Sequence, residues 1–137
     1  MTTRVLYLED EPDIAEVTAM ALEMIGGYEL RHCDRGAAAL AEAERFKPDL
    51  CLFDVMMPGI DGVATYRALR ARDGANAPPV VFLTAKAQLH EQAAYLDEGA
   101  LGVIVKPFDP VELCAKLEGL MALKPPGDGD PPPAPDA

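Results

Sequence analysis

The sequence lacks the residues that several classes of protein require. It has no tryptophan, only three cysteines (Cys33, Cys51 and Cys114) and only two histidines (His32 and His90). The number of cysteines is odd, no C-x-x-C spacing occurs, and the histidines are not spaced to complete a zinc site. We therefore expect the cysteines to be buried thiols in a reducing compartment, with no role as metal ligands.

Positive charge is also scarce. Lysine and arginine together number 12, against 23 aspartates and glutamates, which gives a net charge of −11. Without any run of basic residues, this balance argues against nucleic acid or an anionic membrane as the main partner. No apolar stretch approaches the ~18–20 residues that span a bilayer, and residues 1–4 lead into an apolar run without a signal-peptide pattern. The expectation is a cytoplasmic protein with neither nucleic acid nor membrane as a partner.

The length and composition predict one folded domain with a polar end. The chain has 137 residues, half of them hydrophobic, which is enough for one core. After residue 123 the pattern changes, because the last 14 residues hold six of the 13 prolines, with glycine and aspartate between them. Such a segment buries too little apolar surface to offset its ordering entropy. We expect a domain over residues 1–123 and a flexible tail or truncated linker over 124–137.

Apolar runs of strand length alternate with stretches of helical period along the chain. The strands are expected at residues 5–8, 28–33, 50–53, 80–83 and 101–105, and the helices at 12–25, 37–46, 62–72, 88–98 and from 110 onward. This order predicts an α/β fold, a (βα)5 doubly wound parallel five-stranded sheet. The half-polar run 28–33 suits an edge and the wholly apolar run 50–53 a centre, which fits the flavodoxin-like strand order 2-1-3-4-5.

Local signals mark the helix ends and the inward faces. Asp34 and Asp109 are expected to cap the second and fifth helices. Pro58-Gly59 indicates a turn after the third strand. The apolar residues of the first helix are expected on one face that packs on the sheet: Ile14, Val17, Ala21, Leu22 and Ile25.

Four polar residues lie at the ends of four of these strands. Asp10, Asp54, Thr84 and Lys106 each follow or close an apolar run. In a parallel sheet their side chains converge at the carboxyl edge, where open α/β folds build their sites. Two carboxylates, a hydroxyl and an ammonium in one crevice suit a divalent metal and a phosphoryl group.

The motifs around these residues resemble those of a known family. They are LEDEP at residues 8–12, DVMMPGIDG at 54–62, LTA at 83–85 and VKPF at 105–108. Together and in this order they resemble the receiver domain of two-component response regulators, over about residues 4–122. The resemblance implies that Asp54 accepts a phosphoryl group from a sensor histidine kinase or a histidine phosphotransfer protein.

The resemblance also implies a role for the neighbours of Asp54. Asp10 and Asp54 would ligate Mg²⁺ together with the backbone carbonyl of Met56, while Glu9 would reach the metal through water or position Asp10. Thr84 and Lys106 would bind phosphoryl oxygens, and the Lys106-Pro107 bond would be cis. The domain would be no enzyme towards other substrates, since it would catalyse only its own phosphorylation and dephosphorylation.

Elementary chemistry agrees with these roles. Glu9, Asp10 and Asp54 crowd three carboxylates together, which raises at least one pKa unless a cation is bound. Mg²⁺ prefers hard oxygen ligands in octahedral geometry. The carboxylate of Asp54 is then a nucleophile that forms an acyl phosphate, and an ammonium and a hydroxyl bind the oxygens that carry the charge.

One position departs from the family pattern, and some readings stay open. Many receivers carry an aromatic residue three positions before the lysine, where this chain has Val103.

The helix at 88–98, the strand at 101–105 and the last helix are expected to contact an unknown output protein, and dimerisation on phosphorylation is left open. The chain is either a stand-alone receiver or a fragment of a larger regulator. The alternative from another class is a Mg²⁺-dependent phosphatase or phosphotransferase with an aspartyl nucleophile, which needs an acid at the position of Met56.

Overall fold

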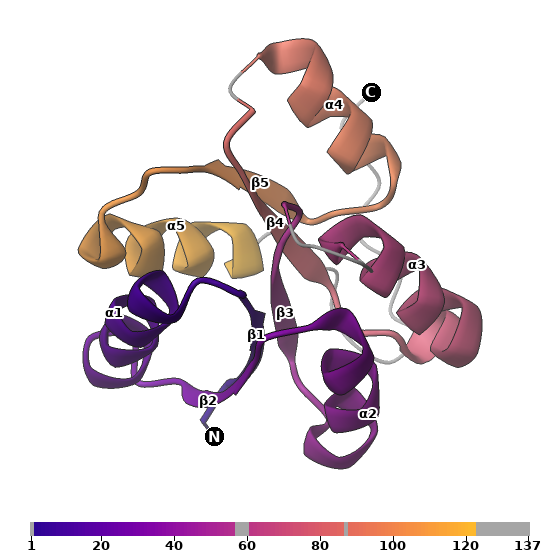
Figure 1. Ribbon diagram of the computed structural model, residues 1–137, viewed down its shortest axis with the longest axis horizontal. Coiled ribbons are helices and arrows are strands. Elements are labelled where there is room, and N and C mark those ends of the chain that lie inside the picture. Colours follow the sequence, from indigo (N-terminus) through magenta and orange to yellow (C-terminus); the bar gives the residue numbers. More distant parts are fainter. Residues whose placement is uncertain (1, 57–60, 87, 123–137) are drawn as a thin grey trace.

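The computed structural model describes residues 2–56, 61–86 and 88–122 of the chain. These residues form one five-stranded parallel sheet in the order β2-β1-β3-β4-β5 with helices on both faces (Figure 1). The strands are β1 (Arg4–Leu8), β2 (Glu29–Cys33), β3 (Leu50–Asp54), β4 (Val80–Thr84) and β5 (Gly102–Val105). The helices are α1 (Pro12–Met24), α2 (Gly36–Phe46), α3 (Gly62–Asp73), α4 (Leu89–Asp97) and α5 (Pro110–Ala122), with a short 3-10 turn at η1 (Gly74–Asn76). The predicted fold class and strand order are confirmed.

Two hydrophobic layers cover the sheet. Because side chains alternate along a strand, Val5 and Tyr7 of β1 face the layer formed with α1 and α5, whereas Leu6 and Leu8 face the layer formed with α2 and α3. β1, β3 and β4 are almost wholly buried, and the half-polar β2 lies at one edge. The inner position of the apolar runs and the edge position of β2 are therefore as the sequence predicts.

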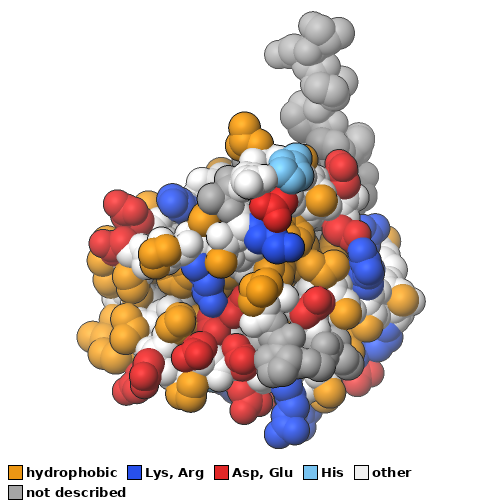
Figure 2. All heavy atoms as spheres, turned by 45° about the horizontal axis from the view of Figure 1, so that its top comes forward, with side chains coloured by type: hydrophobic (Ala, Val, Ile, Leu, Met, Phe, Trp, Pro, Cys, Tyr) orange, Lys and Arg blue, Asp and Glu red, His pale blue; other side chains and the backbone are white. Residues whose placement is uncertain are grey.

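The buried face of α1 differs from the predicted one. Ala21 and Leu22 are buried as expected, but Val17 and Ile25 are more than half exposed and Ile14 is 39% exposed. The helix is turned so that the buried residues are Ala15, Thr18, Ala21 and Leu22. The cause is that α1 carries more apolar side chains than one face can bury. Packing against the sheet and α5 therefore decides which face of the helix points inward. Exposed hydrophobic side chains therefore lie on the side of the molecule that α1 occupies, at the left of Figure 2.

α4 is the least buried helix. No residue of α4 is buried, and Leu89 at its start is 82% exposed. Tyr95 packs on the sheet, with its ring centroid 5.6 Å from that of Phe82 on β4. Just beyond the helix, both carboxylate oxygens of Glu98 accept hydrogen bonds from Arg67 of α3, one from its Nε and the other from its Nη2. The contacts of α4 with the rest of the domain thus include this ring contact, the ion pair at its carboxyl end and a longer ion pair between Glu91 and Lys86.

Of the two predicted helix caps, one is confirmed and one is wrong. The carboxylate of Asp109 accepts a hydrogen bond from Val111 N at 2.8 Å, at the start of α5. Asp34 does not cap α2, because the N-cap residue is Arg35 and no side chain caps that end. The predicted turn at Pro58-Gly59 and the predicted tail at 124–137 lie outside the described residues.

Candidate functional site

The parallel register brings the predicted site residues to one edge of the sheet. Leu8 pairs with Phe53, so Glu9 and Asp10 follow β1 at the level where β3 ends in Asp54. Thr84 closes β4 and pairs with Val105, after which Lys106 follows. Backbone hydrogen bonds hold these ends together, from Lys106 N to Thr84 O at 2.7 Å and from Val55 N to Leu83 O at 2.9 Å.

Lys106 joins two buried carboxylates in this crevice. Its Nζ lies 2.8 Å from Oδ2 of Asp54 and 3.0 Å from Oε1 of Glu9. Glu9 and Asp54 have exposed fractions of 0% and 1%, so both charges are removed from water. A buried carboxylate needs a cation or donors close to it, and Lys106 supplies one ammonium for two of them. The Lys106-Pro107 peptide bond is cis, as predicted.

The shared lysine leaves the charge of the crevice incompletely balanced. Burial, together with the hydrogen bond to Asp54, raises the pKa of Glu9 to about 7, and Lys106 opposes this rise. Burial lowers the pKa of the Lys106 ammonium, but its contacts with Asp54 and Glu9 outweigh burial and leave that pKa above the usual value. Lys106 is therefore protonated at neutral pH, and its single positive charge cannot neutralise the carboxylates of both Glu9 and Asp54.

The acidic residues fit a hard divalent cation. One carboxylate oxygen from each of Glu9, Asp10 and Asp54 lies within 4.8 Å of the others. Asp10 is only half-buried, so the cluster is open to solvent on one side. Oxygen donors with retained waters are the ligands that such a cation prefers. Met56 lies beside the cluster, where its N–H donates to Oδ1 of Asp54 at 2.9 Å; its carbonyl as a ligand stays a prediction.

Thr84 is at the predicted edge, but its hydroxyl has another partner. The side chain is fully buried and its Oγ1 accepts a hydrogen bond from Lys86 N at 3.0 Å. Among the described residues, no hydrogen bond joins Thr84 to Asp54. The hydroxyl therefore belongs to the crevice without contacting the acid.

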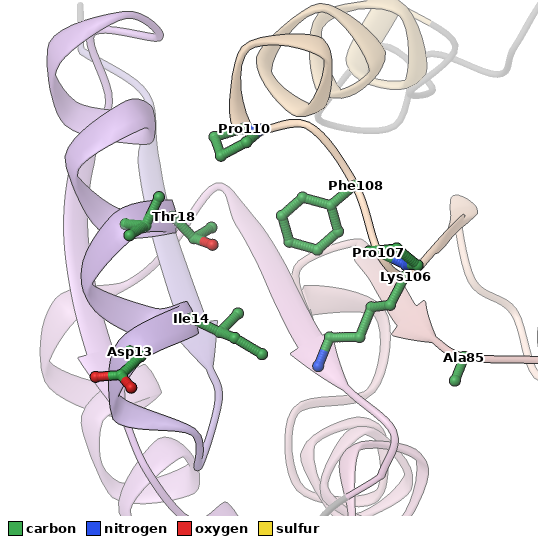
Figure 3. Close-up of a pocket in the computed structure, with 9 residues that line it drawn as sticks. Asp13, Ile14, Thr18, Ala85, Lys106, Pro107, Phe108 and Pro110 are labelled. Carbon is green, nitrogen blue, oxygen red and sulfur yellow. The ribbon is translucent and has the colours of Figure 1, made fainter.

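An apolar pocket of about 500 Å³ opens beside Lys106 (Figure 3). Ile14 and Thr18 of α1 line it on one side, and Phe108 and Pro110 line it on the other. Lys106 also lines the pocket, and its Nζ contacts Glu9 and Asp54. The pocket thus places an apolar surface next to the charged crevice.

Sequence reasoning missed the residues that form hydrogen bonds with Glu9 apart from Lys106. The hydroxyl of Tyr7 lies 3.5 Å from Oε1 of Glu9, and Glu11 N donates to Oε2 at 3.3 Å. The Nε2 of His32 on β2 lies 2.8 Å from the Glu9 carbonyl oxygen. The signal for Tyr7 was present, since residues two apart on a strand share a face. His32 needs the register of β1 with β2, which the sequence alone does not supply.

Comparison with known proteins decides the family. A family model described as the response regulator receiver domain matches residues 5–118. The chain belongs to the response regulator receiver domain family. It is therefore a receiver domain of two-component signalling, a family that is phosphorylated on aspartate.

The relatives of this receiver are regulators of about twice its length. The phosphate regulon transcriptional regulatory protein PhoB of Pseudomonas aeruginosa is 38% identical over 128 residues, which cover 93% of this chain and 56% of PhoB. The DNA-binding response regulator MtrA of Mycolicibacterium smegmatis is 36% identical over 117 residues, which cover 85% of this chain and 50% of MtrA. The receiver thus spans about half the length of these curated relatives.

Solved structures of receivers have the same fold. The chemotaxis response regulator CheY4 of Vibrio cholerae matches with a TM-score of 0.80 at 28% identity, covering 88% of this chain and 99% of CheY4. The BeF3-activated receiver domain of RstA from Klebsiella pneumoniae matches with a TM-score of 0.74 at 29% identity, covering 87% of this chain and 98% of that one.

These relatives correct one expectation about partners. The exclusion of nucleic acid is wrong, because MtrA and the RpaA protein of Synechocystis are named DNA-binding regulators. The net charge of −11 is that of this chain, whose match covers about half of each of these two relatives. No helix among the described residues is long and apolar enough to cross a membrane.

Proposed function

We propose that Asp54 is the phosphoacceptor of this receiver and takes the phosphoryl group from a phosphohistidine of a sensor histidine kinase or histidine phosphotransfer protein. The observation that carries the proposal is the ammonium of Lys106, 2.8 Å from Oδ2 of Asp54 in a buried crevice at the carboxyl edge of the sheet. A carboxylate with a fixed cation beside it is suited to hold a phosphoryl group.

In the transfer, an Asp54 oxygen forms a bond to phosphorus while the P–N bond to the donor imidazole breaks and its electron pair stays on that nitrogen. Charge on the equatorial phosphoryl oxygens needs preformed donors. Lys106 supplies one such donor, and the hydroxyl of Thr84, whose oxygen accepts from Lys86 N, supplies its O–H as another. The N–H of Met56 holds the other oxygen of Asp54 and so orients the carboxylate.

Glu9, Asp10 and Asp54 would hold Mg²⁺, with the Met56 carbonyl as a further ligand. When bound, this ion neutralises negative charge on the phosphoryl oxygens. The donor set supports this assignment, because three carboxylates converge where, of the lysines that the structure describes, only Lys106 supplies an ammonium to Glu9 and Asp54. By this proposal the receiver catalyses only its own phosphorylation and dephosphorylation.

The phosphatase alternative lacks a residue that it requires. An aspartyl phosphatase uses a second acid two residues after the nucleophile, where this chain has Met56 with its apolar side chain 58% exposed. Such a side chain has no proton to give to a leaving group. The match to the receiver family over residues 5–118 favours the signalling function as well.

The test is phosphorylation by a small phosphodonor. Incubation with acetyl phosphate and Mg²⁺, followed by intact mass spectrometry, is expected to add one phosphoryl group to the protein. Asp54→Ala is expected to abolish the addition, while Asp34→Ala, at an exposed carboxylate, is expected to keep it. Addition to Asp54→Ala at the level of the wild type would overturn the assignment.

The names of the relatives support an extension of this proposal. PhoB is named a transcriptional regulatory protein and MtrA a DNA-binding response regulator. We infer that phosphorylation of Asp54 controls a DNA-binding activity. Comparing promoter occupancy in cells that carry the wild type or Asp54→Ala tests this, and equal occupancy under inducing conditions would contradict it.

A further inference from the structure

A tyrosine hydroxyl lies beside the crevice that holds Glu9, Asp54 and Lys106. Tyr7 is fully buried on β1, and Glu9 lies two residues further on, just beyond the end of the strand. The hydroxyl lies 3.5 Å from Oε1 of Glu9. The hydroxyl of Thr18 on α1, itself 1% exposed, is close enough to Tyr7 to oppose the rise that burial causes in the pKa of Tyr7. Tyr7 thus has neighbours on α1 as well as the carboxylate of Glu9.

The oxygen that Tyr7 contacts is the one that Lys106 also contacts. Oε1 of Glu9 receives Lys106 Nζ at 3.0 Å, and that ammonium is shared with Asp54. When the ammonium turns towards a phosphoryl oxygen on Asp54, as in the proposed function, its contact with Glu9 weakens. Where Mg²⁺ occupies only one oxygen of this carboxylate, an Oε1 atom left without a donor carries the cost of its desolvation.

We propose that Tyr7 is a positioning residue for the phosphorylated state, whose hydroxyl keeps Glu9 in place while Lys106 turns to the phosphoryl group. This inference rests on the proposed function of Asp54. It assigns to Tyr7 a role that a purely aliphatic residue at this point of β1 cannot take, because the ring fills the core and the hydroxyl reaches the crevice.

The chain contains a matched control for removal of a buried hydroxyl. Tyr28, just before β2, belongs to the same hydrophobic layer as Tyr7, and its buried hydroxyl has no hydrogen-bond partner in the described parts of the chain. Tyr28→Phe therefore removes the same atom from the same layer without a contact to the site. Both Tyr→Phe changes keep the ring, so packing is preserved.

The main experiment measures binding of beryllofluoride, with Mg²⁺, as a mimic of the phosphoryl group. Hydrogen bonds to charged groups carry enough energy for about a tenfold effect. We expect Tyr7→Phe to weaken binding about tenfold and Tyr28→Phe to leave it unchanged. In a Glu9→Ala background, which removes the acceptor of the Tyr7 hydroxyl, Tyr7→Phe is expected to have no further effect. Wild-type affinity in Tyr7→Phe, or an equal loss with and without the Glu9 carboxylate, would overturn the role of Tyr7.

A second measurement needs neither metal nor phosphoryl mimic. Glu11 N donates to Oε2 of Glu9 at 3.3 Å, so its amide resonance reports the position of that carboxylate. The resonance is expected to move in Tyr7→Phe and to stay in Tyr28→Phe; an unmoved resonance in Tyr7→Phe would contradict the proposal. If Tyr7→Phe fails to fold, Thr18→Val, which removes the hydroxyl behind Tyr7, is expected to shift the same resonance, and no shift would count against the proposal.

The phosphodonor experiment separates this inference from the proposed function. If acetyl phosphate labels the wild type at Asp54 and Tyr7→Phe still binds beryllofluoride as the wild type does, only the role of Tyr7 is wrong. If the wild type takes no label at Asp54, the proposed function itself fails.

Discussion

Replacing Lys106 by methionine should change the stability of the domain in a way that depends on Mg²⁺. The ammonium contacts Glu9 and Asp54 at 3.0 and 2.8 Å, and both acids are buried. Methionine keeps most of the side-chain volume and removes the charge. The two acids then face each other beside Asp10 without the ammonium, and buried charge left uncompensated in this way is strongly destabilising.

The magnitude follows from the burial of the pair. Removing one partner of a buried ion pair costs ~3–5 kcal/mol. The Lys106 side chain is 17% exposed, so we take the lower limit and expect a loss of about 3 kcal/mol in metal-free buffer. A saturating divalent cation stabilises a folded state by ~2.7 kcal/mol at a hundred times its Kd. This gain should be larger in Lys106→Met, because the metal no longer competes with an ammonium.

Urea denaturation followed by circular dichroism, with and without Mg²⁺, measures both quantities. Lys116→Met is the control, since this exposed lysine of α5 lies away from the crevice and such surface changes stay within ~0.5 kcal/mol. The reasoning fails if Lys106→Met is as stable as Lys116→Met without metal. It also fails if Mg²⁺ stabilises Lys106→Met no more than the wild type.

Three further outcomes follow from the crevice and its surroundings. The pKa of Glu9 is raised from 4.5 to about 7 in the folded protein. The stability that its bound proton contributes is therefore fully present below pH 4.5 and is lost as pH rises through 7. Unfolding measured without metal at several pH values should show this loss, and Glu9→Gln should abolish the pH dependence. A Cβ added at Gly62 would lie 2.2 Å from the Asp54 carbonyl oxygen, so Gly62→Ala should cost ~1–3 kcal/mol and reduce labelling of Asp54 by acetyl phosphate. Gly119→Ala in α5, where a Cβ meets nothing within 4 Å, should be neutral or stabilising by up to ~1 kcal/mol, and equal losses in the two variants would contradict the steric argument. The apolar side chain of Met56 cannot orient an attacking water, so the acyl phosphate should not be unusually short-lived; a decay within seconds after removal of the phosphodonor would refute this.

The fold and the composition of the site could be predicted because they depend on patterns that act along the chain. Alternation of apolar runs and helical periods fixes five βα units, and parallel strands bring their carboxyl ends together whatever the side chains are. Asp54, Thr84 and Lys106 therefore reach one edge from positions far apart in the sequence. The half-polar pattern of β2 was likewise enough to place it at an edge.

The remaining features depend on packing between elements. α1 has apolar residues around more than half of its circumference, so periodicity could not tell that Thr18 is buried and Val17 exposed. The sharing of Lys106 between Glu9 and Asp54, and the bond of the Thr84 hydroxyl to Lys86 N, depend on side-chain rotamers and on loop geometry. These rotamers and loop conformations are determined by tertiary packing, which the pattern along the chain does not specify.

The sparse attachment of α4 has a consequence for the energetics of the whole domain. A helix without a buried residue can change its orientation with little loss of core packing, because only the partly buried Tyr95 ring packs against the core cluster among its described residues. Its displacement breaks surface contacts, of which an exposed ion pair or a ring contact is worth about 1 kcal/mol each. A single hydrogen bond to a charged group is of the same size. A few new bonds at the sheet edge are therefore enough to reorient this part of the surface while the interior stays as it is.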